Sequence, residues 1–198
     1  GTITLADVTQ VFTGTAAQMQ AAFSGGIAGT QTGAVTISDT EGTITATTLT
    51  DITAQTNGTV TAAAAGITIS GNTTQLTAAL VTEETKAVVA NGAVSISDTG
   101  NVAATVLSGI GATTGGVVTA ANALTITGTT EEITNALVTE SSLVVASNGS
   151  AAVTFVGDNP TGAQLAAINP KVGGTITLAD VTQVFTGTAA QMQAAFSG

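Results

Sequence analysis

Short segments of alternating character recur along the chain, with a β-branched or large apolar residue at every second position. Threonine or serine fills the intervening positions, so each segment has one apolar and one hydroxylic face. The apolar pairs are Val35 and Ile37, Val94 and Ile96, Val153 and Phe155, and Ile176 and Leu178. This period of two residues predicts β-strands with one buried face.

Between these segments, apolar residues recur at helical spacing, which places two side chains on one helix face. The pairs are Met19 and Phe23, Leu49 and Ile52, Leu76 and Leu80, Leu107 and Ile110, Ile133 and Leu137, Leu165 and Ile168, and Met192 and Phe196. A second signal is the capping box, in which a polar residue precedes Gln or Glu by three positions. It occurs at Thr15 and Gln18, Asn72 and Gln75, Thr129 and Glu132, and Thr161 and Gln164. Both signals predict short helices.

The chain also repeats itself on two scales. Residues 1–25 and 174–198 are identical, at an offset of 173 residues. Within that period, AVTISDT at 34–40 returns as AVSISDT at 93–99 and, more loosely, as AAVTFVGD at 151–158. ITISGNTTQLTAAL at 67–80 returns as LTITGTTEEITNAL at 124–137 and, more weakly, as QVFTGTAAQMQAAF at 10–23. Fixed periods of this order are typical of solenoids and arrays.

We interpret residues 1–198 as one continuous solenoid fragment, in which residues 1–173 form one long period and residues 174–198 begin the next. The long period divides into three double rungs of about 58 residues, each with a short half of about 25 and a long half of about 33 residues. Because residues 1–25 and 174–198 share one sequence, we expect them to share one strand–helix conformation. A simple translation and twist should relate the two copies.

One short strand and one short helix cannot bury a core alone, because ordering the backbone costs more than a few buried side chains return. Stacking of neighbouring units must supply the remainder. We therefore predict an α/β repeat solenoid, with short parallel strands alternating with short helices in about seven rungs. A parallel β-helix is the alternative, because residues 59–63 and 67–70 resemble two strands within one coil.

Composition narrows the function classes. The net charge is −10, and Lys86 and Lys171 are the only basic residues, so nucleic acid is not an expected partner. No apolar run reaches the length of about 18 residues that a membrane-spanning helix requires, so we expect no membrane insertion. The sequence lacks His, Cys and Tyr, which removes the commonest acid–base and nucleophile arrangements. We expect no catalytic residue; a carboxylate-based glycan hydrolase is a distant third alternative.

Three carboxylates fall at equivalent positions just after a predicted strand: Asp39, Asp98 and Asp158, with Glu41 close to the first. They are the candidate calcium ligands. Calcium takes six to eight oxygens, however, and one carboxylate per rung is few. A role in capping a helix or closing a turn is the favoured interpretation. We therefore expect no cofactor, with calcium as the alternative.

The phrases VTISDT, GTVTA, ITISG and GTAAQMQAAF resemble repeats of very large secreted proteins of cyanobacteria and other aquatic bacteria. Such proteins include adhesins, surface-layer components and haemolysin-type calcium-binding proteins. The resemblance implies a secreted or cell-surface location and a structural role, and it carries no catalytic residues to this chain. The calcium-binding nonapeptides of many such proteins do not occur here.

Together these observations predict a structural repeat module that forms a rigid rod, filament, sheath or stalk. The expected partners are other copies of the same repeat or chain. The alternative is an adhesin repeat that binds surface glycan or calcium along one face.

Overall fold

The structure is a computed structural model of the 198-residue chain, and it describes residues 3–27, 29–82, 87–120, 122–139, 144–146, 151–180, 182 and 184–197. The chain forms two compact units. Unit 1 contains Gly1–Val94 and Thr113–Gly116, and unit 2 contains Ser95–Ala112 and Val117–Gly198. The expected continuity of one solenoid over residues 1–198 stays a prediction.

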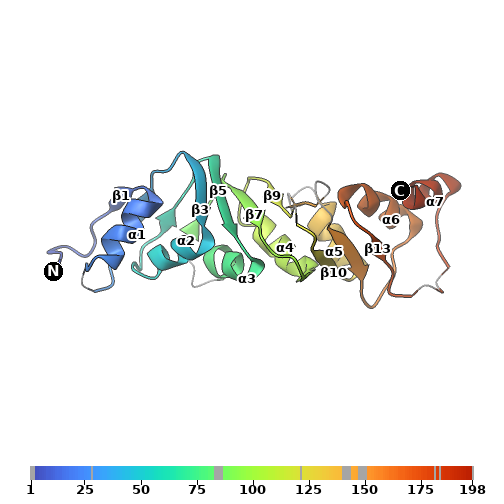
Figure 1. Cartoon of the computed structure of the whole chain (residues 1–198), viewed down its shortest axis with the longest axis horizontal. Helices are drawn as coiled ribbons and strands as arrows, with labels where there is room; N and C mark the ends of the chain where they lie inside the picture. The colour runs from blue at the N-terminus through green and yellow to red at the C-terminus, as the bar shows by residue number, and fades with distance from the viewer. Residues whose placement is uncertain are drawn as a thin grey trace. The chain divides into compact units, whose positions relative to one another are not determined.

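Unit 1 begins with a four-stranded parallel sheet in the order β1-β2-β4-β6, whose first strand, β1, is labelled near the N-terminus in Figure 1. Its strands are β1 (Phe12–Gly14), β2 (Val35–Ile37), β4 (Val60–Thr61) and β6 (Ala87–Val88). A second parallel ladder joins β3 (Glu41–Thr45) to β5 (Gly66–Gly71). The helices are α1 (Ala16–Ser24), α2 (Ala46–Thr53) and α3 (Thr73–Leu76), which continues as the π-helical turn η1 (Thr77–Val81).

The chain passes from unit 1 to unit 2 within β7 (Ala93–Ile96). Unit 2 holds a parallel sheet in the order β13-β12-β10-β8, and its strands are β8 (Asn101–Ala103), β10 (Thr125–Gly128), β12 (Ala152–Phe155) and β13 (Ile176–Thr177). A second ladder pairs β9 (Val118–Thr119) with β11 (Val144–Val145). The helices are α4 (Ala104–Gly111), α5 (Thr130–Leu137), α6 (Gly162–Ile168) with the 3₁₀ turn η3 (Asn169–Lys171), and α7 (Ala189–Phe196).

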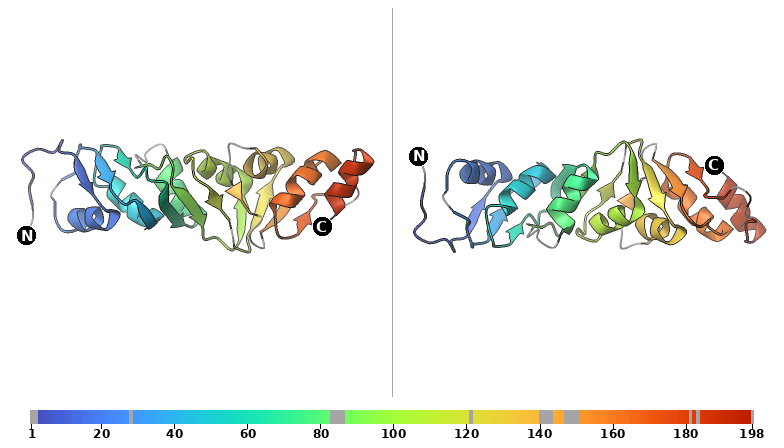
Figure 2. Two further views of the ribbon diagram at one scale, coloured as in Figure 1. Left: turned by 90° about the horizontal axis from the view of Figure 1, so that it is seen from above. Right: turned by 90° about the horizontal axis from the view of Figure 1, so that it is seen from below.

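Each ladder joins segments that lie about half a double rung apart along the chain. In unit 1, Phe12 lies opposite Val35, and Val35 lies opposite Val60. In unit 2, Ile126 lies opposite Val153, which lies opposite Ile176. The helices also pack in the order of the chain. In unit 1, α1 packs on α2, and in unit 2, α4, α5, α6 and α7 pack in succession (Figure 2). The prediction of an α/β fold with parallel strands is confirmed.

The number of strands per helix differs from the prediction. Among the described residues, two strands precede each of α2, α3, α5 and α6, and three precede α4, whereas the apolar pattern predicted one strand for each helix. In β3 only Ile44 is buried, so the segment contains no pair of alternating apolar residues and gives no periodic signal. The suggestion of two strands within residues 59–70 is confirmed, because β4 and β5 are separate strands there.

The core consists of the predicted apolar faces except the pair Ile176 and Leu178, which is half-exposed, with Leu178 beyond the end of β13. The strand residues Val35, Val94 and Val153 are at most 1% exposed. Of the fourteen predicted helix-face residues, twelve are buried: Met19, Phe23, Leu49, Ile52, Leu76, Leu80, Leu107, Ile110, Ile133, Leu137, Leu165 and Ile168. Burying each such side chain contributes roughly 1.5–3 kcal/mol. The two exceptions, Met192 and Phe196, lie on α7.

All four predicted capping boxes are present. The side chains of Thr15, Asn72, Thr129 and Thr161 accept from the amide three residues later, and the Gln or Glu at that position accepts from the cap amide. A fifth box, at Thr188, begins α7. These caps satisfy helix amides that would otherwise lack a partner, which explains where the short helices begin.

The two identical copies share their local structure but not their strand pairing. Helix, capping box and an edge-to-face phenylalanine pair recur in both, with ring centroids 5.3 Å apart for Phe12 and Phe23 and 5.4 Å apart for Phe185 and Phe196. The first copy pairs with the residues that follow it, and the second copy pairs through β13 with the residues that precede it. The expected common conformation is therefore found in the helices, and a translation and twist between the copies stays a prediction.

Candidate functional site

The carboxylates predicted as calcium ligands lie in the connections after strands. Asp39 follows β2, and its Oδ2 accepts a hydrogen bond from the backbone amide of Ala16 at 2.7 Å. Asp158 follows β12, and its Oδ1 accepts from the amide of Thr130 at 2.8 Å. Both amides belong to the first residue of a helix, α1 or α5, so each carboxylate caps a helix of the preceding repeat. The favoured capping role thus has a direct structural counterpart, although the helix capped is the preceding one.

The other two candidates differ from each other in exposure. Asp98 lies half-buried between β7 and β8, and Glu41 is exposed as the first residue of β3, opposite Gly66. Among the described residues, no three His, Cys, Asp or Glu side chains lie together in a group that could hold a metal ion. Calcium binding stays a prediction. In the structure, one carboxylate oxygen of Asp39 and one of Asp158 each accept a hydrogen bond from a helix amide.

Asp7 and Asp180 are the same residue in the two identical copies, and both close a local turn. Oδ1 of Asp7 accepts from the amide of Thr9 at 2.8 Å and from its hydroxyl. Oδ1 of Asp180 accepts from the amide and hydroxyl of Thr182 at 2.8 and 2.7 Å. These hydrogen bonds lower the pKa of both carboxyl groups below 3.8, and the bond from the threonine hydroxyl has the largest effect.

The outward faces of the sheets carry rows of threonine. In unit 1, Thr13 lies opposite Thr36, and Thr36 lies opposite Thr61. In unit 2, Thr127, Thr154 and Thr177 form a similar row across β10, β12 and β13. Neighbouring strands that carry such a row are about 4.8 Å apart. The rows present donors and acceptors to solvent, which is the chemistry needed to bind a polyhydroxylated ligand.

A feature that the sequence reasoning missed is a buried threonine bridge between consecutive segments of unit 1. The Thr56 hydroxyl, in a residue that is 1% exposed, donates to the Gly33 carbonyl oxygen at 2.6 Å and accepts from the amide of Gly58 at 2.9 Å. Thr114, 58 residues later, repeats the arrangement with the carbonyl of Gly92 and the amide of Gly116. The signal was the recurrence of Thr-x-Gly at an interval of 58 residues.

The glycines of these bridges allow the backbones to approach closely. A Cβ on Gly58 would lie 2.3 Å from the Gly33 carbonyl oxygen, and one on Gly116 would lie 2.4 Å from the Gly92 carbonyl oxygen. Atoms cannot approach so closely, so any side chain would force the two segments apart. The bridge is therefore a structural device that sets the spacing between consecutive repeats.

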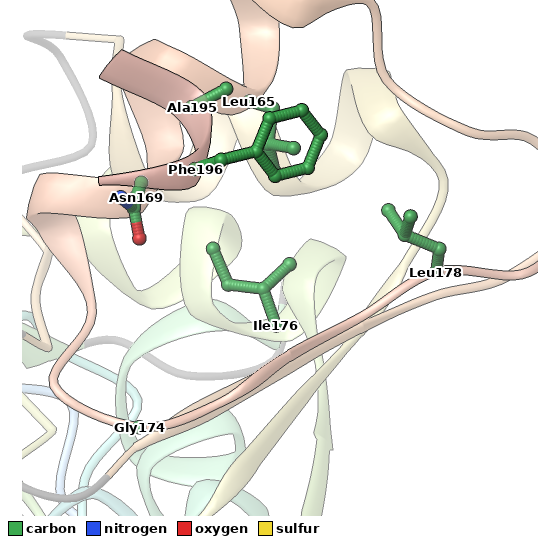
Figure 3. Close-up of a pocket in the computed structure, with 7 residues that line it drawn as sticks. All are labelled: Leu165, Asn169, Gly174, Ile176, Leu178, Ala195 and Phe196. Atoms are coloured by element: carbon green, nitrogen blue, oxygen red, sulfur yellow. The ribbon is translucent and has the colours of Figure 1, made fainter. Parts of the chain in front are cut away.

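An exposed aromatic side chain of unit 2 lies on α7. Phe196 is 60% exposed, whereas Phe23, at the same place in the identical first copy, is 7% exposed. A pocket of about 260 Å³ lies beside Phe196, and Figure 3 shows Leu165, Ile176 and Leu178 facing the same space. A second pocket, of about 550 Å³, shares Asn169 and Gly174 with the first.

No described helix has both the length and the apolar character needed to cross a membrane. Comparisons of the chain with protein-family models, with curated proteins and with solved structures gave no match.

Proposed function

We propose that this chain is a structural repeat module of a long extracellular or cell-surface protein, and that its repeats stack as the rungs of a rigid α/β solenoid. The observation that carries the proposal is the parallel pairing of segments one repeat apart, such as Phe12 with Val35 and Val35 with Val60. Pairing of this kind has no natural end, because each strand that pairs with its predecessor offers its other edge to a successor.

Stiffness in such a rod comes from two sources. Backbone hydrogen bonds link each strand to the next, and apolar side chains form continuous rows between neighbouring repeats. Within unit 1, buried Val35 and Val60 are successive members of one row, and Thr56 and Gly58 hold the adjoining turn at a fixed spacing. The number of repeats then sets the length of the rod, and the function is mechanical: a spacer, stalk, sheath or fibre.

The external location is supported by the resemblance to repeats of large secreted proteins and by the scarcity of basic residues. The sequence contains two lysines and no arginine. A protease that cleaves after basic residues therefore finds few sites, which suits a protein exposed to secreted proteases. The net charge of −10 keeps neighbouring copies soluble through mutual repulsion.

The test is the length of covalent arrays. Two and four copies of residues 1–173, joined so that each residue 174 begins the next copy, are examined by negative-stain electron microscopy. We expect particles of constant width whose length doubles from two copies to four. Particles that grow in all dimensions, as compact globules do, would rule out the rod.

A second candidate function is an adhesin repeat that binds glycan, and the observation in its favour is the row of outward threonines formed by Thr13, Thr36 and Thr61. A glycan array probed with the chain tests it, with Thr36→Val as the matched variant. Saturable binding that the variant weakens would support the adhesin, and no binding to any glycan would leave the mechanical role.

A further inference from the structure

Asparagine followed by glycine occurs at two places in the described part of unit 1, at Asn57 and Gly58 and at Asn91 and Gly92. This dipeptide is chemically reactive, because glycine has no side chain to keep its amide nitrogen away from the preceding carboxamide. Both asparagines are exposed. Solvent base and water therefore reach the side chain that would react.

The reaction is deamidation through a succinimide. A solvent base removes the proton of the glycine amide, and the glycine nitrogen attacks Cγ of the asparagine. The new bond from nitrogen to Cγ closes the ring, the bond from Cγ to Nδ2 breaks, and Nδ2 takes up a proton and leaves as ammonia. Water then opens the ring at either carbonyl. One opening gives aspartate, and the other gives isoaspartate, in which the main chain runs through Cβ and Cγ.

In the native turn at Asn57, the attacking nitrogen is already engaged. The Gly58 amide donates to Oγ1 of Thr56 at 2.9 Å, and that hydroxyl donates to the Gly33 carbonyl at 2.6 Å. Thr56 itself is 1% exposed. The bridge therefore withholds the Gly58 amide proton from solvent base, in the same way that a hydrogen bond protects an amide from hydrogen exchange.

The backbone on both sides of the reacting bond is also held in place. The Asn57 amide donates to the Gln31 carbonyl at 2.7 Å. A Cβ on Gly58 would lie 2.3 Å from the Gly33 carbonyl oxygen, which shows how closely the two backbones approach. Ring closure moves the Gly58 nitrogen toward the Asn57 carboxamide, so the turn must first separate from Gly33.

We propose that Asn57 is a site of spontaneous covalent modification, and that the Thr56 bridge keeps this site closed in the native chain. The inference goes beyond the proposed mechanical function, and it holds whether or not the repeats form a rod. Asn91 provides an internal comparison. The residue before it is Ala90, which has no hydroxyl to bind the amide of Gly92, so the reactivity of Asn91 does not depend on Thr56.

Modification at Asn57 acts on the spacing between consecutive segments. Isoaspartate adds a methylene group to the main chain between the contact with Gln31 and the contact with Gly33. Strand β4 follows, where buried Val60 lies opposite Val35 of β2. Either product also adds a negative charge to a chain whose net charge is −10. The Thr56 hydroxyl therefore protects the chemical integrity of the turn as well as its spacing.

The test compares the wild-type chain with Thr56→Val at mildly alkaline pH, both folded and in guanidinium chloride. Samples are digested with pepsin in acid, which stops the reaction, and deamidation at Asn57 and Asn91 is quantified by mass spectrometry. We expect Asn57 of the folded wild type to react more slowly than in the denatured chain. Thr56→Val should raise the folded rate about fivefold for each hydrogen bond that it removes, up to the denatured rate. The denatured rates of the two chains should agree.

Two further variants serve as controls. Thr56→Ser keeps a hydroxyl and should retain the protection of Asn57. Thr114→Val makes the same chemical change in the equivalent bridge to Gly92 and Gly116, and it leaves the contacts of Thr56 in place. Asn57 should then react at the wild-type rate. In Thr56→Val, an unchanged rate at Asn91 separates local opening of the turn from unfolding of the whole chain.

The proposal is overturned if Asn57 reacts as fast in the folded wild type as in the denatured chain, or if Thr56→Val leaves its rate unchanged. It is also overturned if Thr114→Val raises the rate at Asn57 equally, or if Thr56→Val accelerates Asn91 to the same extent. Isoaspartate in the product, identified by electron-transfer fragmentation, supports the succinimide route, and a product of aspartate alone would exclude it. None of these outcomes bears on the length of covalent arrays, so the proposed function is tested separately.

Discussion

Replacing Thr56 with valine tests whether the buried threonine bridge holds consecutive repeats together. Valine has nearly the shape of threonine, so the change replaces the hydroxyl with a methyl group of similar size and removes its hydrogen bonds. Two hydrogen bonds are lost, one to the Gly33 carbonyl and one from the amide of Gly58. Each is worth about 1 kcal/mol, and a buried polar group left without a partner costs a further 1–3 kcal/mol or so.

The third equivalent position shows how far the chain can compensate. Val172 follows Thr114 by 58 residues, and there the amide of Gly174 donates directly to the Ala151 carbonyl at 2.8 Å. If Gly58 moves to reach Gly33 in the same way, one of the two hydrogen bonds is restored. We therefore expect Thr56→Val to lower the free energy of unfolding by about 1–3 kcal/mol.

The assay follows from the composition. The sequence has neither tryptophan nor tyrosine, so urea unfolding is followed by circular dichroism, and hydrogen exchange by mass spectrometry localises the effect to residues 31–62. Thr36→Val is the matched control, because it makes the same chemical change at an exposed position of β2 and should stay within about 0.5 kcal/mol of the wild type. Equal stability of the two variants would refute the bridge.

Three further predictions concern caps, turns and carboxyl groups. Asp39→Ala should speed exchange of the Ala16 amide by about fivefold, corresponding to a cap worth about 1 kcal/mol, while Asp39→Asn keeps an acceptor and should have a smaller effect. Gly58→Ala should cost about 2 kcal/mol or more in urea unfolding, because its Cβ would meet the Gly33 carbonyl, whereas Gly100→Ala meets nothing within 4 Å and should be neutral or slightly stabilising. Asp7 and Asp180 have lowered pKa values, so their stabilising contribution is present above pH 3.8 and is lost as the pH falls through the folded-state pKa. Thr9→Val should raise the pKa of Asp7, which a carbon-detected NMR titration measures. An unchanged pKa would show that the Thr9 hydroxyl is not the cause.

Helices are the most predictable part of this fold. Their apolar pairs and capping boxes are local signals, since residues three or four positions apart determine them. Thr15 with Gln18 and Thr129 with Glu132 mark helix starts that the structure confirms. The equivalence of Asp39 and Asp158 is also visible in the repeats of the sequence, where one carboxylate per rung favours a capping role over calcium.

Strand number and strand pairing are less predictable for a physical reason. A helix is about 10 Å wide, whereas neighbouring strands are about 4.8 Å apart. In stacked repeats with one strand per helix, the layer of helices would therefore be about twice as long as the layer of strands, and the stack would have to curve strongly. The chain uses two strands before several helices and distributes them over separate ladders, as with β2 and β3 before α2. No local pattern encodes that distribution, because it depends on which segments meet in space.

The identical copies separate what local sequence determines from what neighbours determine. Residues 16–24 and 189–196 form the same helix, with the same capping box and the same phenylalanine pair, so the sequence suffices for these features. Burial differs, since Phe23 is 7% and Phe196 60% exposed, and the difference follows from whether a succeeding repeat covers the helix. The segment therefore keeps its local conformation in both places, whereas the burial of its helix face depends on its neighbours.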